Sequence, residues 1–98
     1  MYTAKTYLSE LRHLIGDVSV FIDGANEDNK KKMSEIAKKM TGDIAMVNGA
    51  LRDNNIKAAS ASSLELTFYL REIRELAGII DHGKIDRYIS ALEALQSE

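Results

Sequence analysis

The chain contains no cysteine, no proline and no tryptophan, and it has only two phenylalanines and four tyrosines among its 98 residues. The lack of cysteine excludes a disulfide framework, a thiolate nucleophile and a zinc site with sulfur ligands. The lack of proline removes the residue that interrupts helices most strongly. Few aromatic side chains leave few platforms on which nucleic-acid bases could stack. The composition therefore favours continuous helices without cysteine chemistry.

The chain also lacks a large net charge and a long apolar run. Its 13 basic and 15 acidic residues give a formal charge of −2, a balance that argues against a dedicated nucleic-acid-binding protein. Asp17 and Asp23 interrupt the most apolar region, so no segment has the roughly 18 uncharged residues that cross a membrane. The first residues do not form a secretory signal. We therefore expect a cytoplasmic protein without membrane association, folded as a single helical-bundle domain over residues 1–98.

Apolar residues recur alternately four and three positions apart in three segments, the spacing that holds one stripe of a helix against a partner helix. The three series are Ala4, Leu8, Leu11, Ile15, Val18 and Ile22, then Met33, Ala37, Met40, Ile44, Val47 and Leu51, and then Leu66, Leu70, Ile73, Ala77 and Ile80. In the first segment Tyr7, Leu14 and Phe21 add a second apolar column beside the series. This periodicity predicts an all-α fold.

Turn and cap residues divide the chain into helices. The first helix is expected over residues 3–23, with Gly24 ending it in a left-handed conformation. Asn26 is a good cap for a second helix that continues to about Arg52. The third helix is expected to start near Asn55, because the apolar series extends back to that point. The alternative is a start near Ser63, where Ser62 and Glu65 form a capping-box pattern.

The C-terminal part of the chain predicts a shorter fourth helix. His82 is placed in the last turn of the third helix and Gly83 at its end, so the fourth helix is expected over residues 84–96. Its apolar side consists of Ile85, Tyr88, Ile89, Leu92 and Leu95. Short connections predict an antiparallel four-helix bundle with up-down-up-down order. The short last helix cannot cover the whole groove left by the first three, so either the bundle tapers or a second copy of the chain completes it.

The histidines are the first candidates for chemistry. Glu10 and His13 have the Glu-x-x-His spacing of metal-binding bundles, but a di-metal site needs two such pairs and two further glutamates. Counting from Leu8 and Leu11 puts the pair on the opposite, solvated face. A histidine phosphotransfer protein using His13 or His82 is an alternative, although Asp17 would repel a phosphoryl group one turn after His13. We expect neither an enzyme nor a bound metal or cofactor.

A basic cluster in the second helix is the basis of another alternative, weak binding of nucleic acid. The cluster consists of Lys30, Lys31, Lys32, Lys38 and Lys39. Acidic residues stand four positions before three of these lysines, in the pairs Glu27–Lys31, Asp28–Lys32 and Glu35–Lys39. That arrangement supports a helix and is more typical of a solvated face than of a phosphate-binding one.

Small and apolar residues on outward faces indicate a protein interface instead. Gly42 and Gly49 lie two turns apart in the second helix, with Ala45 and Met46 between them, although each glycine weakens a helix by about 1 kcal/mol. Leu64 and Phe68 lie one turn apart on the outer face of the third helix, and Val20 and Ile79 are similarly misplaced. The sequence thus predicts a non-enzymatic protein that binds another protein, with a two-fold homodimer as the leading arrangement.

Overall fold

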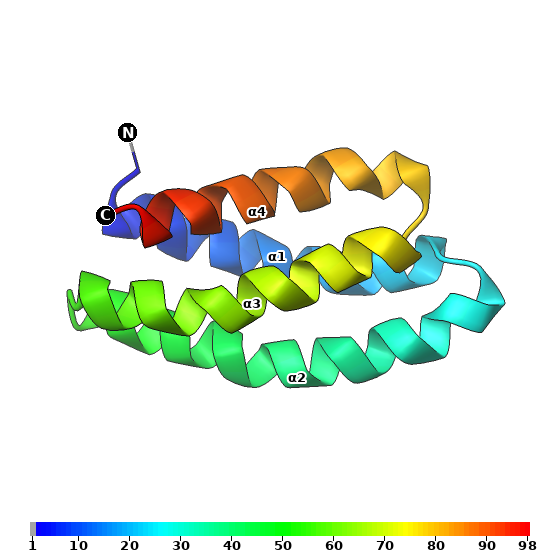
Figure 1. Cartoon of the computed structure of the whole chain (residues 1–98), viewed down its shortest axis with the longest axis horizontal. Coiled ribbons are helices and arrows are strands. Elements are labelled where there is room, and N and C mark those ends of the chain that lie inside the picture. The colour runs from blue at the N-terminus through cyan, green and yellow to red at the C-terminus, as the bar shows by residue number, and fades with distance from the viewer. Residues whose placement is uncertain (1) are drawn as a thin grey trace.

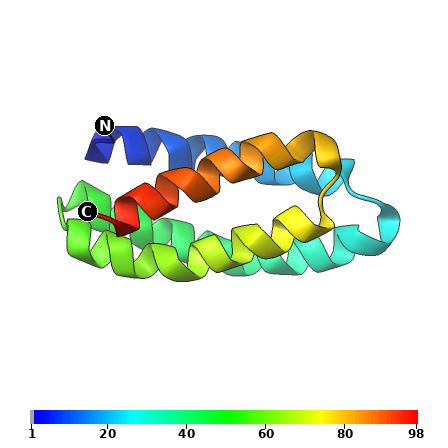
Figure 2. The ribbon, with the colours of Figure 1, turned by 45° about the horizontal axis from the view of Figure 1, so that its top comes forward.

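Four helices pack side by side in the computed structural model, which describes residues 2–98. They are α1 (Ala4–Gly24), α2 (Glu27–Arg52), α3 (Ile56–Leu76) and α4 (His82–Gln96), with a single 3-10 turn, η1 (Ile79–Asp81), before α4 (Figure 1). Each helix packs against its neighbours in the chain, and α4 closes the bundle against α1 (Figure 2). This arrangement confirms the predicted all-α, antiparallel four-helix bundle. Within residues 2–98 no helix is long and apolar enough to cross a membrane.

Side-chain caps set where the first three helices begin. The Thr3 hydroxyl accepts a hydrogen bond from the Thr6 amide at 3.3 Å, and the Asn26 side chain accepts one from the Asn29 amide at 3.0 Å. Asn55 caps α3 in the same way, accepting from the Ala58 amide at 3.1 Å. The early start of the third helix is therefore confirmed, and the alternative start near Ser63 is wrong. A cap satisfies backbone donors that a helix leaves unpaired at its N-terminus.

The predicted end of the third helix is wrong by more than one turn. α3 ends at Leu76, so His82 does not lie in its last turn but begins α4, and Gly83 lies in the first turn of α4. The side chain of Asn29 donates a hydrogen bond to the Leu76 carbonyl oxygen at 3.1 Å. This cap comes from α2, 47 residues away in the chain, so the local sequence around residue 76 does not reveal it.

Gly24 and Gly78 allow two connections to lie against each other at one end of the bundle. A Cβ atom on Gly24 would lie 2.9 Å from Asp81 Oδ2, and one on Gly78 would lie 3.2 Å from the Gly24 carbonyl oxygen. The predicted left-handed conformation of Gly24 is wrong, because no glycine within residues 2–98 has a positive φ. Gly24 is instead the last residue of α1, and Ala25 after it is extended. A side chain at either position would therefore be crowded, by Asp81 at Gly24 and by the backbone of Gly24 at Gly78.

The core confirms the predicted apolar side of α4 and most of the predicted side of α2. Ile85, Tyr88, Ile89, Leu92 and Leu95 of α4 are buried, as are Met33, Met40, Ile44, Val47 and Leu51 of α2. Leu66, Leu70 and Ile73 of α3 are buried as well. The last two members of the α3 series, Ala77 and Ile80, lie beyond the end of the helix.

In α1 the structure corrects the predicted orientation. The buried residues are Tyr7, Leu11, Leu14 and Phe21, so the second apolar column faces the core. Of the predicted series only Leu11 is buried, and Ile15 is 56% exposed. Two adjoining apolar columns widen the apolar stripe of a helix, but they do not specify which edge of it faces inward.

Polar contacts connect α4 to the side of α1 that carries the second apolar column. The Tyr88 hydroxyl donates a hydrogen bond to Asp17 Oδ2, and the ring of Tyr88 packs edge-on against Phe21 at 6.5 Å between centroids. Arg87 forms an ion pair with Glu10 at 3.5 Å. An open groove lies on the other side of α1, between α1 and α2.

Candidate functional site

Most of the predicted interface residues lie on one outward surface, which we call the outer α2/α3 face. It comprises Gly42, Met46 and Gly49 of α2 and Leu64 and Phe68 of α3. Met46, Leu64 and Phe68 are 61%, 60% and 59% exposed, and the two glycines are also exposed. A Cβ atom on either glycine would meet no atom within 4 Å. The predicted exposure of these five residues is therefore confirmed, and their role in an interface stays a prediction.

The antiparallel packing of α2 and α3 brings these residues to matching levels. Asn29 meets Leu76 at one end of the pair, and Asp43 lies beside Glu65 near the middle. Continuing this register puts Gly42 level with Phe68, and Met46 level with Leu64, to within about one helical turn. The outer α2/α3 face thus has two glycines and the exposed Met46 on α2 beside Leu64 and Phe68 on α3.

Ala45 lies at the edge of the predicted surface. It is exposed, and it also lines a groove between α1 and α2. A helix advances about 100° per residue, so Ala45 is turned by about 60° from Gly42, toward α1. The predicted six-residue surface therefore borders the groove at Ala45.

A carboxyl pair lies between α2 and α3 at the centre of the outer α2/α3 face. Oδ2 of Asp43 is buried and has no hydrogen-bond partner within residues 2–98. Burial and the neighbouring Glu65 carboxylate together raise the pKa of Asp43. Burial, and then the same carboxylate, also raise the pKa of Tyr69, whose ring packs edge-on against Phe68 at 6.0 Å. Ionisation of the Asp43 carboxyl group is thus disfavoured at this point.

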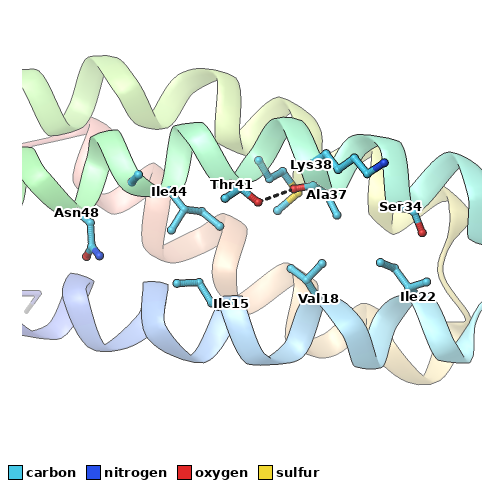
Figure 3. Close-up of a pocket in the computed structure, with 11 residues that line it drawn as sticks. Ile15, Val18, Ile22, Ser34, Ala37, Lys38, Thr41, Ile44 and Asn48 are labelled. Carbon is cyan, nitrogen blue, oxygen red and sulfur yellow. Dashed lines mark hydrogen bonds between the residues drawn. The ribbon is translucent and has the colours of Figure 1, made fainter.

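The second surface, the α1/α2 groove, is the unfilled side of the bundle and has a volume of about 440 Å³. Ile15, Val18 and Ile22 point from α1 toward α2 across this space (Figure 3). The facing wall of α2 includes Ala37, Met40, Ile44 and Ala45. These α1 residues belong to the series predicted to face the core. Because the second apolar column of α1 faces the core instead, they line the groove.

Two hydroxyl groups in the groove are already used by the backbone. Ser34 donates to the Lys30 carbonyl oxygen at 2.9 Å, and Thr41 donates to the Ala37 carbonyl oxygen at 3.1 Å. Because these hydroxyls bond to the preceding turn of their own helix, they offer little to a ligand. The middle of the groove is therefore more apolar than its residue types suggest.

A second hollow of about 550 Å³ continues the groove toward the N-terminus of α1, and the two share Ile15 and Asn48. Lys5, Arg12 and Arg52 line this end. None of the three forms an ion pair with another residue of the described chain, residues 2–98. No carboxylate lines either hollow, although the chain as a whole is slightly acidic.

The remaining predicted candidates do not form a common site. His13 is exposed on α1, whereas Glu10 is half-buried toward α4, so the prediction that both are solvated is wrong for Glu10. Glu10 turns inward because the buried column of α1 is adjacent to it. No group of three or more His, Cys, Asp or Glu side chains within residues 2–98 is placed to hold a metal ion.

The lysine cluster is only partly paired with acids. Lys30 forms an ion pair with Glu27 at 2.9 Å, whereas none of the three predicted pairs forms in the described part of the chain. Residues three and four apart are both within reach on a helix surface, and such pairs differ by only tenths of a kcal/mol, so spacing alone did not select the partner. Comparison of the chain with protein families, curated proteins and solved structures finds no match.

Proposed function

We propose that this protein has a non-enzymatic role and acts by protein–protein interaction, as a two-fold homodimer formed through the outer α2/α3 face. The supporting observation is the exposure of about 60% of Met46, Leu64 and Phe68 on adjacent helices. Exposed apolar side chains are common singly, but a group of them beside a flat strip is typical of an association surface. The cytoplasmic location predicted from the sequence is part of the same proposal.

The shape of this face suits a partner with the same face. A two-fold axis parallel to the helices and midway between α2 and α3 would place α2 of one copy over α3 of the other at the same level. Phe68 of each copy would then lie against Gly42 of its partner, and Leu64 against Met46. The contact of Phe68 with Gly42 would then occur twice, once on each side of the axis, as an isologous interface requires.

Light scattering of the purified protein tests this arrangement. We expect a dimer for the wild type, and a monomer for Phe68→Glu and for Gly49→Glu, because each puts a charge into an apolar contact. Ile80→Glu is the matched control, since Ile80 is 90% exposed but lies outside the face, and it should remain dimeric. A monomeric wild type, or dimers that persist in both face variants, would exclude this interface.

Alanine substitutions separate helix stability from association. Gly16, Gly42 and Gly49 all lie inside helices, with open space where a Cβ atom would be added, so alanine should stabilise the monomer by about 0.5–1 kcal/mol at each. Only Gly42→Ala and Gly49→Ala should also weaken the dimer, because a methyl group would hold the partner helix away. Gly16→Ala, on α1, should leave association unchanged. Equal effects of all three on dimerisation would contradict the proposed close approach.

A further inference from the structure

The α1/α2 groove differs in kind from the outer α2/α3 face, because its two ends have different chemistry. Along the apolar part, Val18, Ile22 and Ile44 lie under an open space that no segment of residues 2–98 fills. At the other end Lys5, Arg12 and Arg52 surround the adjoining hollow. Ile15 and Asn48 border both parts and make them continuous. A ligand lying in this groove would meet apolar surface first and three cations next.

The dimensions of the apolar part restrict what can enter it. Ser34 and Asn48 mark its two ends on α2, and the 14 residues between them rise about 21 Å. A volume of about 440 Å³ spread over about 21 Å corresponds to a mean cross-section of roughly 20 Å². A helix with side chains is about 10–12 Å across and could insert only the side chains of one face. A single extended hydrocarbon chain fits the space.

The charges at the basic end restrict the other part of the ligand. Lys38 lines the apolar hollow and Lys5, Arg12 and Arg52 line the second one, while no carboxylate lines either. A concave surface lined by one sign of charge attracts ions of the opposite sign. Arginine forms paired hydrogen bonds with carboxylate and phosphate groups, so Arg12 and Arg52 favour an anionic head group.

We propose that the α1/α2 groove binds a single-chain anionic amphiphile, of which a long-chain carboxylate is the simplest form. Its hydrocarbon chain lies along Ile15, Val18 and Ile22, and its head group lies among Lys5, Arg12 and Arg52. The chain and head-group positions follow from the apolar middle and basic end of one continuous groove. This site is separate from the proposed dimer interface, so either proposal can fail without the other.

Calorimetric titration with decanoate, dodecanoate and tetradecanoate, each below its micellar concentration, tests the apolar part. Each added methylene should tighten binding by roughly two- to fourfold, up to the chain length that fills the groove. Dodecylammonium has the same tail with the opposite charge, and it should bind at least tenfold more weakly than dodecanoate. Absence of dodecanoate binding, or equal binding of the two probes, would overturn the proposal.

Two variants test the two parts of the groove. The control for the apolar part is a substitution on the same helix, and the control for the basic end is a substitution with the same change in charge. Ile15→Glu should reduce dodecanoate affinity at least tenfold, whereas Val20→Glu should not, because Val20 is a similarly exposed residue of α1 outside the groove. Arg12→Glu should also weaken binding at least tenfold, and Lys31→Glu should leave it unchanged. Both groove residues are exposed, so a circular-dichroism spectrum like that of the wild type is expected.

The alternative occupant is a partner helix with an acidic end. An acidic amphipathic peptide of about 14 residues, the length of the groove, should bind more weakly than tetradecanoate. Tighter binding of the peptide, lost in Ile15→Glu, would replace the amphiphile with a protein partner and refute the proposal. Phe68→Glu should bind dodecanoate like the wild type, and a loss of binding there would show that the groove is not an independent site.

Discussion

The hydrogen bond from Tyr88 to Asp17 is expected to be a major support of the contact between α4 and α1. Tyr88 is buried, and burial together with the Asp17 carboxylate raises its pKa. Replacing Tyr88 with Phe keeps the ring against Phe21 but removes the hydroxyl group. The Asp17 carboxylate then loses a donor at a half-buried position.

The magnitude follows from the kind of hydrogen bond. A bond to a charged group contributes about 1.5–3 kcal/mol, so Tyr88→Phe should destabilise the protein by about 2 kcal/mol. In a domain of this size each kcal/mol lowers Tm by about 4–8 °C, so a loss of about 8–16 °C is expected. Since the whole fold is stabilised by only about 5–10 kcal/mol, the effect is large enough to measure reliably.

Urea unfolding of Tyr88→Phe, Asp17→Ala and the double variant measures the pair. The double-mutant cycle should give a coupling of about 1.5 kcal/mol or more, because the two groups are in direct contact. Tyr2→Phe is the matched control, since the Tyr2 hydroxyl makes no hydrogen bond within residues 2–98 and its change should stay within about 0.5 kcal/mol. A coupling below about 0.5 kcal/mol would refute the role assigned to this bond.

Three further predictions concern the rest of the bundle. Asp43→Asn should stabilise the protein increasingly as pH rises above about 4. The raised pKa of Asp43 means that the wild type loses stability as pH rises from the value of the unfolded chain through the raised value. Measuring Tm of both proteins as pH is raised tests the direction of this dependence, and a difference in Tm that does not change with pH would contradict it. Leu70→Ala should cost about 2–5 kcal/mol in urea unfolding because Leu70 is fully buried, whereas Leu64→Ala on the exposed face should cost about 0.5 kcal/mol or less in the monomer. Asn29→Ala should cost about 1 kcal/mol and speed amide exchange near Leu76, and unchanged exchange there would argue against this cap.

Local sequence determined the helices themselves. Alternating spacings of three and four, together with Asn26 and Asn55 as caps, predicted α2 and the start of α3 correctly. The reason is that hydrogen bonds and caps of a helix connect residues close in the chain. The same local periodicity identified Phe68 and Gly49 as outward-facing residues.

Contacts between distant segments decided the rest. α3 ends at Leu76, where the side chain of Asn29 from another helix donates to the carbonyl oxygen, although the apolar spacing continued past that point. The sequence contained both apolar columns of α1, and the second column was the only signal that could have revealed the groove. The column that faces the core lies beside Asp17, which accepts the hydrogen bond from Tyr88, 71 residues away.

The sequence by itself therefore determined which residues form helices and which sides of α2 and α4 are apolar, since these depend on spacing along one helix. Only the tertiary structure decided how α1 is rotated, because a wide apolar stripe can pack along either edge and α4 selects one of them. That rotation leaves Ile15 exposed and opens the α1/α2 groove beside the cations of its basic end.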